Sequence, residues 1–204
     1  MPRTHHPAAA SPVKDPMIDH FKSGWNIVKN GFVGWIVFGI VLLVLFSFGI
    51  GIFLWPNAFR AIRKASESQQ GPSLGDLFNF DNIVDDAVAM IVYLVAIWIG
   101  SLFCGVGGVV AAVLLFWMPM LAADGKFAAV DNAKASLAHA KTIIGPIIVF
   151  FIVTWLINFC GALLCYIGVL VTFPLTIAAQ WVFYTQYRHD ILTTAQQAGV
   201  PTKP

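Results

Sequence analysis

Two long apolar tracts without charge constrain the fold of this chain more than any other feature. They cover residues 87–123 and 143–184, and neither contains Asp, Glu, Lys or Arg. As continuous helices they would be about 55 Å long or more, whereas a helix of about 20 residues already crosses a bilayer. Because lipid offers no hydrogen-bond partners to the backbone, each tract is predicted to cross as a helix, fold back and cross again.

Each tract is interrupted near its midpoint by the tripeptide Phe-Cys-Gly. In the first tract the tripeptide leads into the run CGVGG, whose glycines can adopt positive φ and close a tight turn. In the second tract the predicted break runs from Asn158 to Gly161. The hairpin turns are therefore assigned to Cys104, Gly105, Gly107, Gly108, Cys160 and Gly161.

A third apolar tract, residues 32–55, has a weaker version of the same break, Phe-Ser-Phe-Gly at 46–49. At 24 residues this tract could be one tilted helix of about 36 Å. Alternatively, a first helix that begins near Trp25 and a second that continues to Arg63 would form a shorter hairpin. The sequence predicts six membrane helices in the second case and five in the first.

The distribution of positive charge favours six helices. All 12 Lys and Arg lie in residues 3–29, 60–64, 126–141 and 188–203. If the three tracts are hairpins, these four segments share one side of the membrane and the turns share the other, as the positive-inside rule predicts. We therefore expect an inner (cytoplasmic) membrane protein of several passes with both termini in the cytoplasm.

Composition agrees with a membrane protein, since 58% of residues are hydrophobic, 11% are charged and the mean hydropathy is +0.78. The predicted fold is an all-α polytopic bundle of three repeated hairpins, about 25–63, 84–123 and 142–187, with short interfacial amphipathic helices between them. Residues 1–18 are predicted to be a disordered tail, 19–190 the membrane domain and 191–204 a C-terminal tail.

The first connecting segment carries a helix-capping signal and several acidic residues. Ser73 can cap a short helix, with Asp76 three residues on. Asp81, Asp85 and Asp86 are expected to face water. The second connecting segment, residues 123–142, is also predicted to be an amphipathic interfacial helix.

Both connecting segments resemble those of known membrane families. The runs PNAFRAIRKASESQQGPSLGDLFNFDN and AADGKFAAVDNAKASLAHAKTIIGPIIVF resemble the junctions of bacterial six-helix membrane proteins of unknown function. They are also similar to the membrane region attached to some glycerophosphodiester phosphodiesterases. The resemblance implies an architecture and a bacterial source. It transfers no catalytic residues, because this chain has no phosphodiesterase domain.

No catalytic, cofactor-binding or metal-binding residues can be assigned from sequence motifs. The chain has no GxSxG, HExxH or Walker motif. Its three Cys fit neither a zinc pair nor a disulfide framework, and a disulfide between Cys104 and Cys160 is left open. Within the apolar tracts, the polar residues Asn158 and Gln180 are predicted to form hydrogen bonds between helices or at the interface. Two residues are assigned as helix kinks: Pro119 and Pro174.

These features favour a small non-enzymatic integral membrane protein, acting as an accessory, scaffold or assembly subunit of a membrane complex. Its expected partners are the lipid bilayer and other membrane subunits or further copies of itself, and a net charge of +2 gives no argument for nucleic acid. The alternative is a channel or carrier for an uncharged or amphipathic solute. A lipid-modifying enzyme ranks third, and it would depend on the interfacial carboxylates Asp76, Asp81, Asp85 and Asp86.

Overall fold

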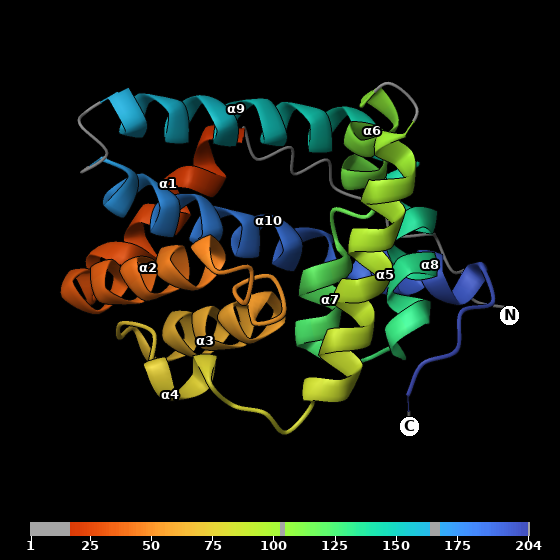
Figure 1. Cartoon of the computed structure of the whole chain (residues 1–204), viewed down its shortest axis with the longest axis horizontal. Helices are drawn as coiled ribbons and strands as arrows, with labels where there is room; N and C mark the ends of the chain where they lie inside the picture. Colours follow the sequence, from red (N-terminus) through yellow and green to blue (C-terminus); the bar gives the residue numbers. More distant parts are fainter. Residues whose placement is uncertain (1–16, 103–104, 164–167, 204) are drawn as a thin grey trace, which may run out of the picture.

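The computed structural model describes residues 17–102, 105–163 and 168–203, and every regular element within these ranges is a helix (Figure 1). The predicted all-α class is therefore confirmed. In chain order the helices are α1 (Met17–Lys29), α2 (Phe32–Ser47), α3 (Trp55–Ser68), α4 (Leu74–Leu77), α5 (Ile83–Ser101), α6 (Val106–Leu114), α7 (Met118–Asp124), α8 (Ala129–Ala140), α9 (Ile144–Leu163) and α10 (Val169–Gln197).

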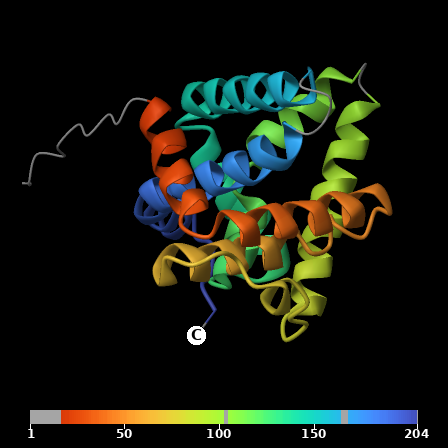
Figure 2. The same ribbon diagram turned by 90° about the vertical axis from the view of Figure 1, so that its left-hand side faces the viewer.

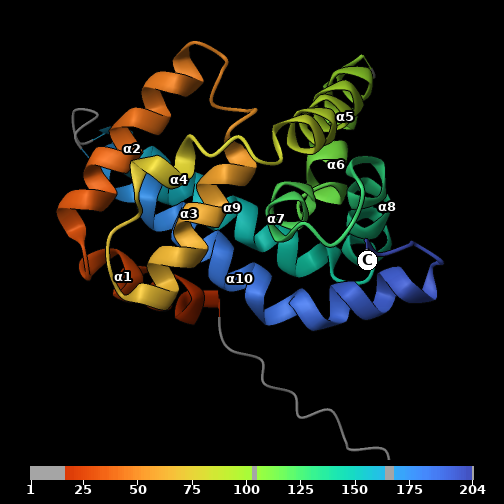
Figure 3. The same cartoon turned by 90° about the horizontal axis from the view of Figure 1, so that it is seen from below.

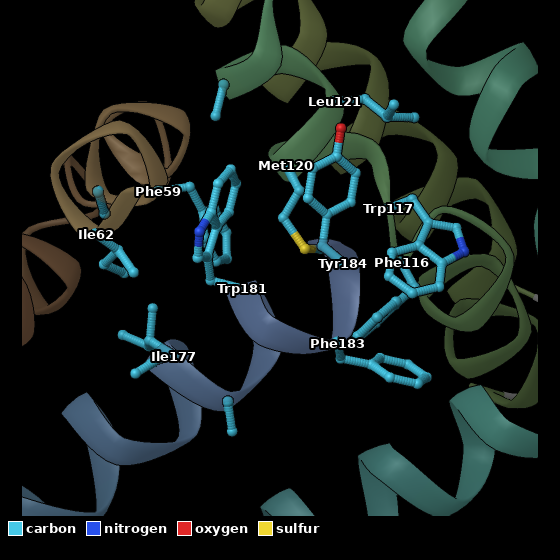
Figure 4. Packing of buried hydrophobic residues seen from close by; sticks show 14 of the residues in the cluster. Phe59, Ile62, Phe116, Trp117, Met120, Leu121, Ile177, Trp181, Phe183 and Tyr184 are labelled. Atoms are coloured by element: carbon cyan, nitrogen blue, oxygen red, sulfur yellow. The ribbon is translucent and has the colours of Figure 1, made fainter. Parts of the chain in front are cut away.

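Helix α10 is at the centre of the fold. Helices α1, α2, α3, α8 and α9 all pack against it (Figure 3). Figure 4 shows Trp181 and Tyr184 of α10 among buried side chains of α3 and of the segment around Trp117. Phe183 stacks on Phe150 of α9, with ring centroids 4.7 Å apart and planes 2° from parallel. The apolar residues of α10 therefore form the core that joins the two halves of the chain.

Helices α5 and α9 lie on the outside with most of their apolar surface uncovered. In each, only 17% of the most apolar window is buried. Figures 1 and 2 agree that α5 runs across the direction of α9. Because α5 and α9 are not parallel in this arrangement, they cannot both run along the normal of one bilayer. An arrangement of three hairpins standing side by side is thus not confirmed.

The described residues contain three helical stretches long and apolar enough to cross a membrane. They are α5, α9 and the stretch Val106–Asp124, which comprises α6 and α7. A fourth is counted if α1 and α2, which are bent by 104° relative to each other, are taken as one span. These lengths and hydropathies are those of a membrane-embedded protein. The six spans and the hairpin repeat are not confirmed.

The apolar tract at residues 32–55 is broken at the expected place. Helix α2 ends at Ser47, α3 begins at Trp55, and Gly49 between them has a φ of +75°. The alternative of a single tilted helix over residues 32–55 is therefore wrong. The segments on either side are short, because α2 has 16 residues and α3 has 14.

The C-terminal segment differs from the predicted tail. Helix α10 continues past residue 190 to Gln197, and the backbone N–H of Lys203 donates to the carbonyl of Lys126 at 2.8 Å. The ammonium of Lys203 also pairs with Asp85. Residues 191–203 thus comprise the end of α10 and a short segment that is bound to the rest of the protein through Lys203. The predicted N-terminal tail lies mostly in residues 1–16, outside the described residues.

Candidate functional site

The turn predicted within residues 87–123 is only partly where it was expected. Gly105 precedes α6 with a φ of +75°, as a turn glycine should. Gly107 and Gly108 instead lie inside α6, where they allow close approach to α5. A Cβ on Gly100 of α5 would lie 2.5 Å from the carbonyl oxygen of Gly107. Their role is therefore helix packing, and Cys104 lies outside the described residues.

The turn assigned to Cys160 and Gly161 is wrong. Both residues lie in the last turn of α9, which ends at Leu163. A Cβ on Gly161 would collide with the hydroxyl of Thr172 and lie 3.1 Å from the carbonyl carbon of Gly168. Gly161 is needed because α9 and α10 approach closely there. Cys160 is exposed and has no disulfide partner among the described residues, which do not include Cys104.

The two prolines assigned as kinks occupy different helical positions. Pro119 is the second residue of α7, where its missing N–H would have no helical acceptor. Pro119 therefore lies in the first turn of α7, a new helix that follows the break after Leu114. Pro174 lies within α10, as expected for a kink. A Cβ on Gly39 of α2 would lie 2.8 Å from Pro174 Cγ, so α2 packs closely against this proline.

The intramembrane polar residues lie along the contact between α9 and α10. The amide of Asn158 donates to the carbonyl of Thr154 and to the hydroxyl of Thr176 in α10, each at 3.1 Å. The expected interhelix hydrogen bond is present. Gln180 is one turn beyond Thr176 and lines a cavity. Within the described part of the chain, three buried oxygens here have no hydrogen-bond partner: Thr154 Oγ1, Asn158 Oδ1 and Thr172 Oγ1.

That cavity has a volume of about 290 Å³ and is lined from five parts of the chain. Its polar lining comes from Thr154 and Gln180 on α9 and α10, together with the hydroxyl-bearing ring of Tyr93 on α5. None of the Asp, Glu, Lys or Arg residues in the described ranges lines it. Most of the wall is aromatic: Phe46, Trp55, Tyr93, Phe116, Phe150 and Phe151. This lining suits an uncharged, partly apolar molecule.

A second polar feature is a buried ion pair between α3 and α5. The Arg60 guanidinium holds both carboxylate oxygens of Asp86, with Nη2–Oδ1 at 2.8 Å and Nη1–Oδ2 at 2.5 Å. Arg60 also donates to the carbonyls of Ala122 at 3.0 Å and Ala123 at 3.3 Å, near the C-terminus of α7. Asp86 is only 2% exposed, so the expectation that it faces water is wrong. Burial is tolerated because Arg60 neutralises the carboxylate.

A second buried carboxylate extends this network to α10. Asp124 accepts hydrogen bonds from Arg188 at 3.0 and 3.1 Å and from the Tyr184 hydroxyl at 3.2 Å. Arg63 of α3 is 3.7 Å from the same carboxylate. Burial alone would lower the pKa of Arg188, but the hydrogen bond and the charge of Asp124 raise it above the ordinary value. We call Arg60, Arg63, Asp86, Asp124 and Arg188 the charge junction.

Reasoning from the sequence did not find the charge junction. The available signal was that Asp86 and Asp124 flank the uncharged tract at residues 87–123, next to basic residues at the ends of other apolar segments. The pairing of these particular side chains could not be read from their spacing. The described residues contain no group of three His, Cys, Asp or Glu side chains that could hold a metal ion.

Helix α8 carries a buried histidine that makes stability depend on pH. His139 is 3% exposed, between the rings of Trp117 and Tyr187. Burial lowers the pKa of His139, although Asp190 opposes the shift. Below pH about 6.5 the unfolded chain binds a proton at this residue more readily than the folded chain does. Stability is therefore expected to fall as pH decreases through this range.

This expectation is tested by measuring the thermal midpoint in mild detergent between pH 8 and pH 5. Replacing His139 with Gln should flatten the loss of stability toward low pH. The matched control is His189→Gln, because His189 is exposed on α10 and should leave the profile unchanged. An unaltered pH profile in the His139 variant would contradict the assignment.

No protein-family model, curated protein or solved structure matches this chain.

Proposed function

We propose that this chain is a non-enzymatic integral membrane protein that serves as an accessory, scaffold or assembly subunit of a membrane complex. The observation that carries the proposal is the charge junction, which ties α3, α5, α7 and α10 together through Asp86 and Asp124. These helices come from all three predicted hairpins. Each of the two buried carboxylates, Asp86 and Asp124, is paired with arginine, and this arrangement holds the helices together.

Ion pairs that hold helices together favour a scaffold over a carrier, whose helices must move. A carrier exposes its site to alternate sides by moving one group of helices against another. Separating Arg60 from Asp86 would leave a buried charge without its partner, at a cost of about 3–5 kcal/mol. The surfaces that stay open are the apolar faces of α5 and α9, which include Val95 and Ile152. We propose that partner helices dock on these faces.

The proposed location is the bacterial inner membrane, with both termini in the cytoplasm. The charge junction gathers Arg60, Arg63 and Arg188, and Lys203 lies close by through its ion pair with Asp85. The positive-inside rule would place this basic end in the cytoplasm. The resemblance of the connecting segments to bacterial membrane proteins supports the same location.

The test is native mass spectrometry of the tagged protein, purified from its native membrane in a mild detergent. An additional protein in stoichiometric amount is the expected result. A mass equal to an integer multiple of the 22.2 kDa chain plus lipid would contradict the accessory role and favour a channel or carrier.

The docking surface is tested separately with a photoreactive amino acid at single positions. Val95 on α5 and Ile152 on α9 are both about half exposed on the apolar faces. Crosslinks from these positions to the co-purified protein are expected. Lys134 on α8 is an exposed polar control and should give none. Crosslinks from Lys134 alone would contradict the proposal and would show that the partner binds near α8 and not on the apolar faces.

A further inference from the structure

An apolar groove lies next to the aromatic cavity. The groove has a volume of about 550 Å³ and lies between α6 and α9. Val110 and Val113 line it on one side, and Ile148 and Trp155 on the other, and all of its lining residues are apolar. Phe151 of α9 lines both the cavity and the groove. The two spaces therefore adjoin at one side chain.

Of the two spaces, only the cavity has polar atoms in its lining. Thr154 and Gln180 line the cavity, and the hydroxyl of Thr154 is buried with no hydrogen-bond partner among the described residues. A buried hydroxyl without a partner is unfavourable, and a ligand group that bonds it would remove this cost. The groove offers no polar atom at all. A molecule that fits both spaces thus has a hydrogen-bonding head and an apolar chain.

The charge of the head follows from the lining. Among the residues that the structure describes, no Lys, Arg, Asp or Glu lines either space, so a phosphate, carboxylate or ammonium group would be buried without a counterion. We propose that this protein binds an uncharged single-chain lipid. Its head lies in the aromatic cavity against Thr154 and Gln180, and its chain lies in the groove between α6 and α9. The groove includes Ile152, so it overlaps the part of the α9 face on which we propose that a partner docks, and the lipid is therefore tested on the purified chain alone.

The test is a titration of the purified full chain with monooleoylglycerol, followed by native mass spectrometry. One retained monooleoylglycerol per chain is expected. Thr154→Val and Gln180→Leu should each weaken binding about tenfold, because each removes a hydrogen-bonding group from the lining of the cavity. Their controls are Thr185→Val and Gln196→Leu, exposed residues of the same types on α10 that do not line the cavity. The controls should bind as the unmodified chain does.

The chain-binding groove is tested by filling it. Val110→Trp adds bulk inside the groove on α6 and should also weaken binding, whereas Val95→Trp on the exposed face of α5 should not. Thermal midpoints of all variants are recorded alongside, so that a variant that fails to fold is recognised and the remaining ones decide. Binding that no variant changes, or no retained lipid above the detergent background, would overturn the proposal.

The charge requirement is tested with two further lipids that carry the same chain. Oleate has a negative head, and oleoyl lysophosphatidylcholine has a zwitterionic one. Both are expected to bind at least tenfold more weakly than monooleoylglycerol. Equal binding of oleate would overturn the uncharged head. Neither outcome changes the co-purification result, so failure of the lipid site and failure of the accessory role are distinguished.

Discussion

Replacing Asp86 with Asn is expected to lower the free energy of unfolding by about 3–5 kcal/mol. The carboxylate is 2% exposed and holds the Arg60 guanidinium through two hydrogen bonds. An amide has nearly the same shape but no charge, so the guanidinium would stay in the interior without its counterion. The measurement is a denaturation titration in mild detergent with SDS, followed by circular dichroism.

The control for this prediction is Asp81→Asn. Asp81 is exposed near the start of the same helix, and its replacement should change the free energy of unfolding by no more than about 0.5 kcal/mol. A double variant, Arg60→Met with Asp86→Leu, removes both charges and should recover much of the loss. If Asp86→Asn unfolds at the same denaturant concentration as the unmodified chain, the ion pair does not hold these helices together.

Replacing Gly107 with Ala is expected to lower the free energy of unfolding by about 1–3 kcal/mol. A Cβ on Gly107 would collide with the carbonyl oxygen of Gly100, and a Cβ on Gly100 would lie 2.5 Å from the carbonyl oxygen of Gly107. Both obstacles are backbone atoms of the neighbouring helix, so α5 and α6 would have to move apart. Helix pairs in membranes depend on such small residues for close packing. The same SDS titration measures the loss.

The matched control is Gly145→Ala at the start of α9. An added Cβ there meets nothing within 4 Å, and the backbone has no positive φ. Alanine should be neutral or stabilise the protein by up to about 1 kcal/mol, because it reduces the conformational freedom of the unfolded chain. Equal effects of the two substitutions would show that the contact between α5 and α6 has no special weight.

The two Phe-Cys-Gly copies show what the sequence pattern could and could not predict. Both were interpreted as turns because they occupy the same place in two apolar tracts. Gly105 does have the positive φ of a turn residue, whereas Gly161 is helical and lies against the start of α10. A glycine serves equally well where the backbone must turn and where two helices must touch. The sequence shows the glycine but not which of the two requirements it meets.

Short-range features were predicted correctly. Ser73 was expected to cap a short helix, and its hydroxyl accepts a hydrogen bond from the N–H of Gly75 at 3.1 Å. The break after Ser47 was also expected. Both depend on residues within a few positions of one another. Asp86, in contrast, was expected to face water. That expectation was wrong because its partner, Arg60, lies 26 residues away in another helix.

The sequence by itself determined that the protein is helical, that it is apolar enough for a membrane and that its long tracts are interrupted. Each of these follows from local hydropathy and from the need of the backbone to satisfy its own hydrogen bonds in lipid. Only the tertiary structure decided which helices touch, that Arg60 holds Asp86, and that Thr154 and Gln180 face one cavity. Those outcomes depend on how helices that are distant in sequence pack together. The hydrophobic effect is not directional, so the order of apolar residues along the chain does not specify which helices touch.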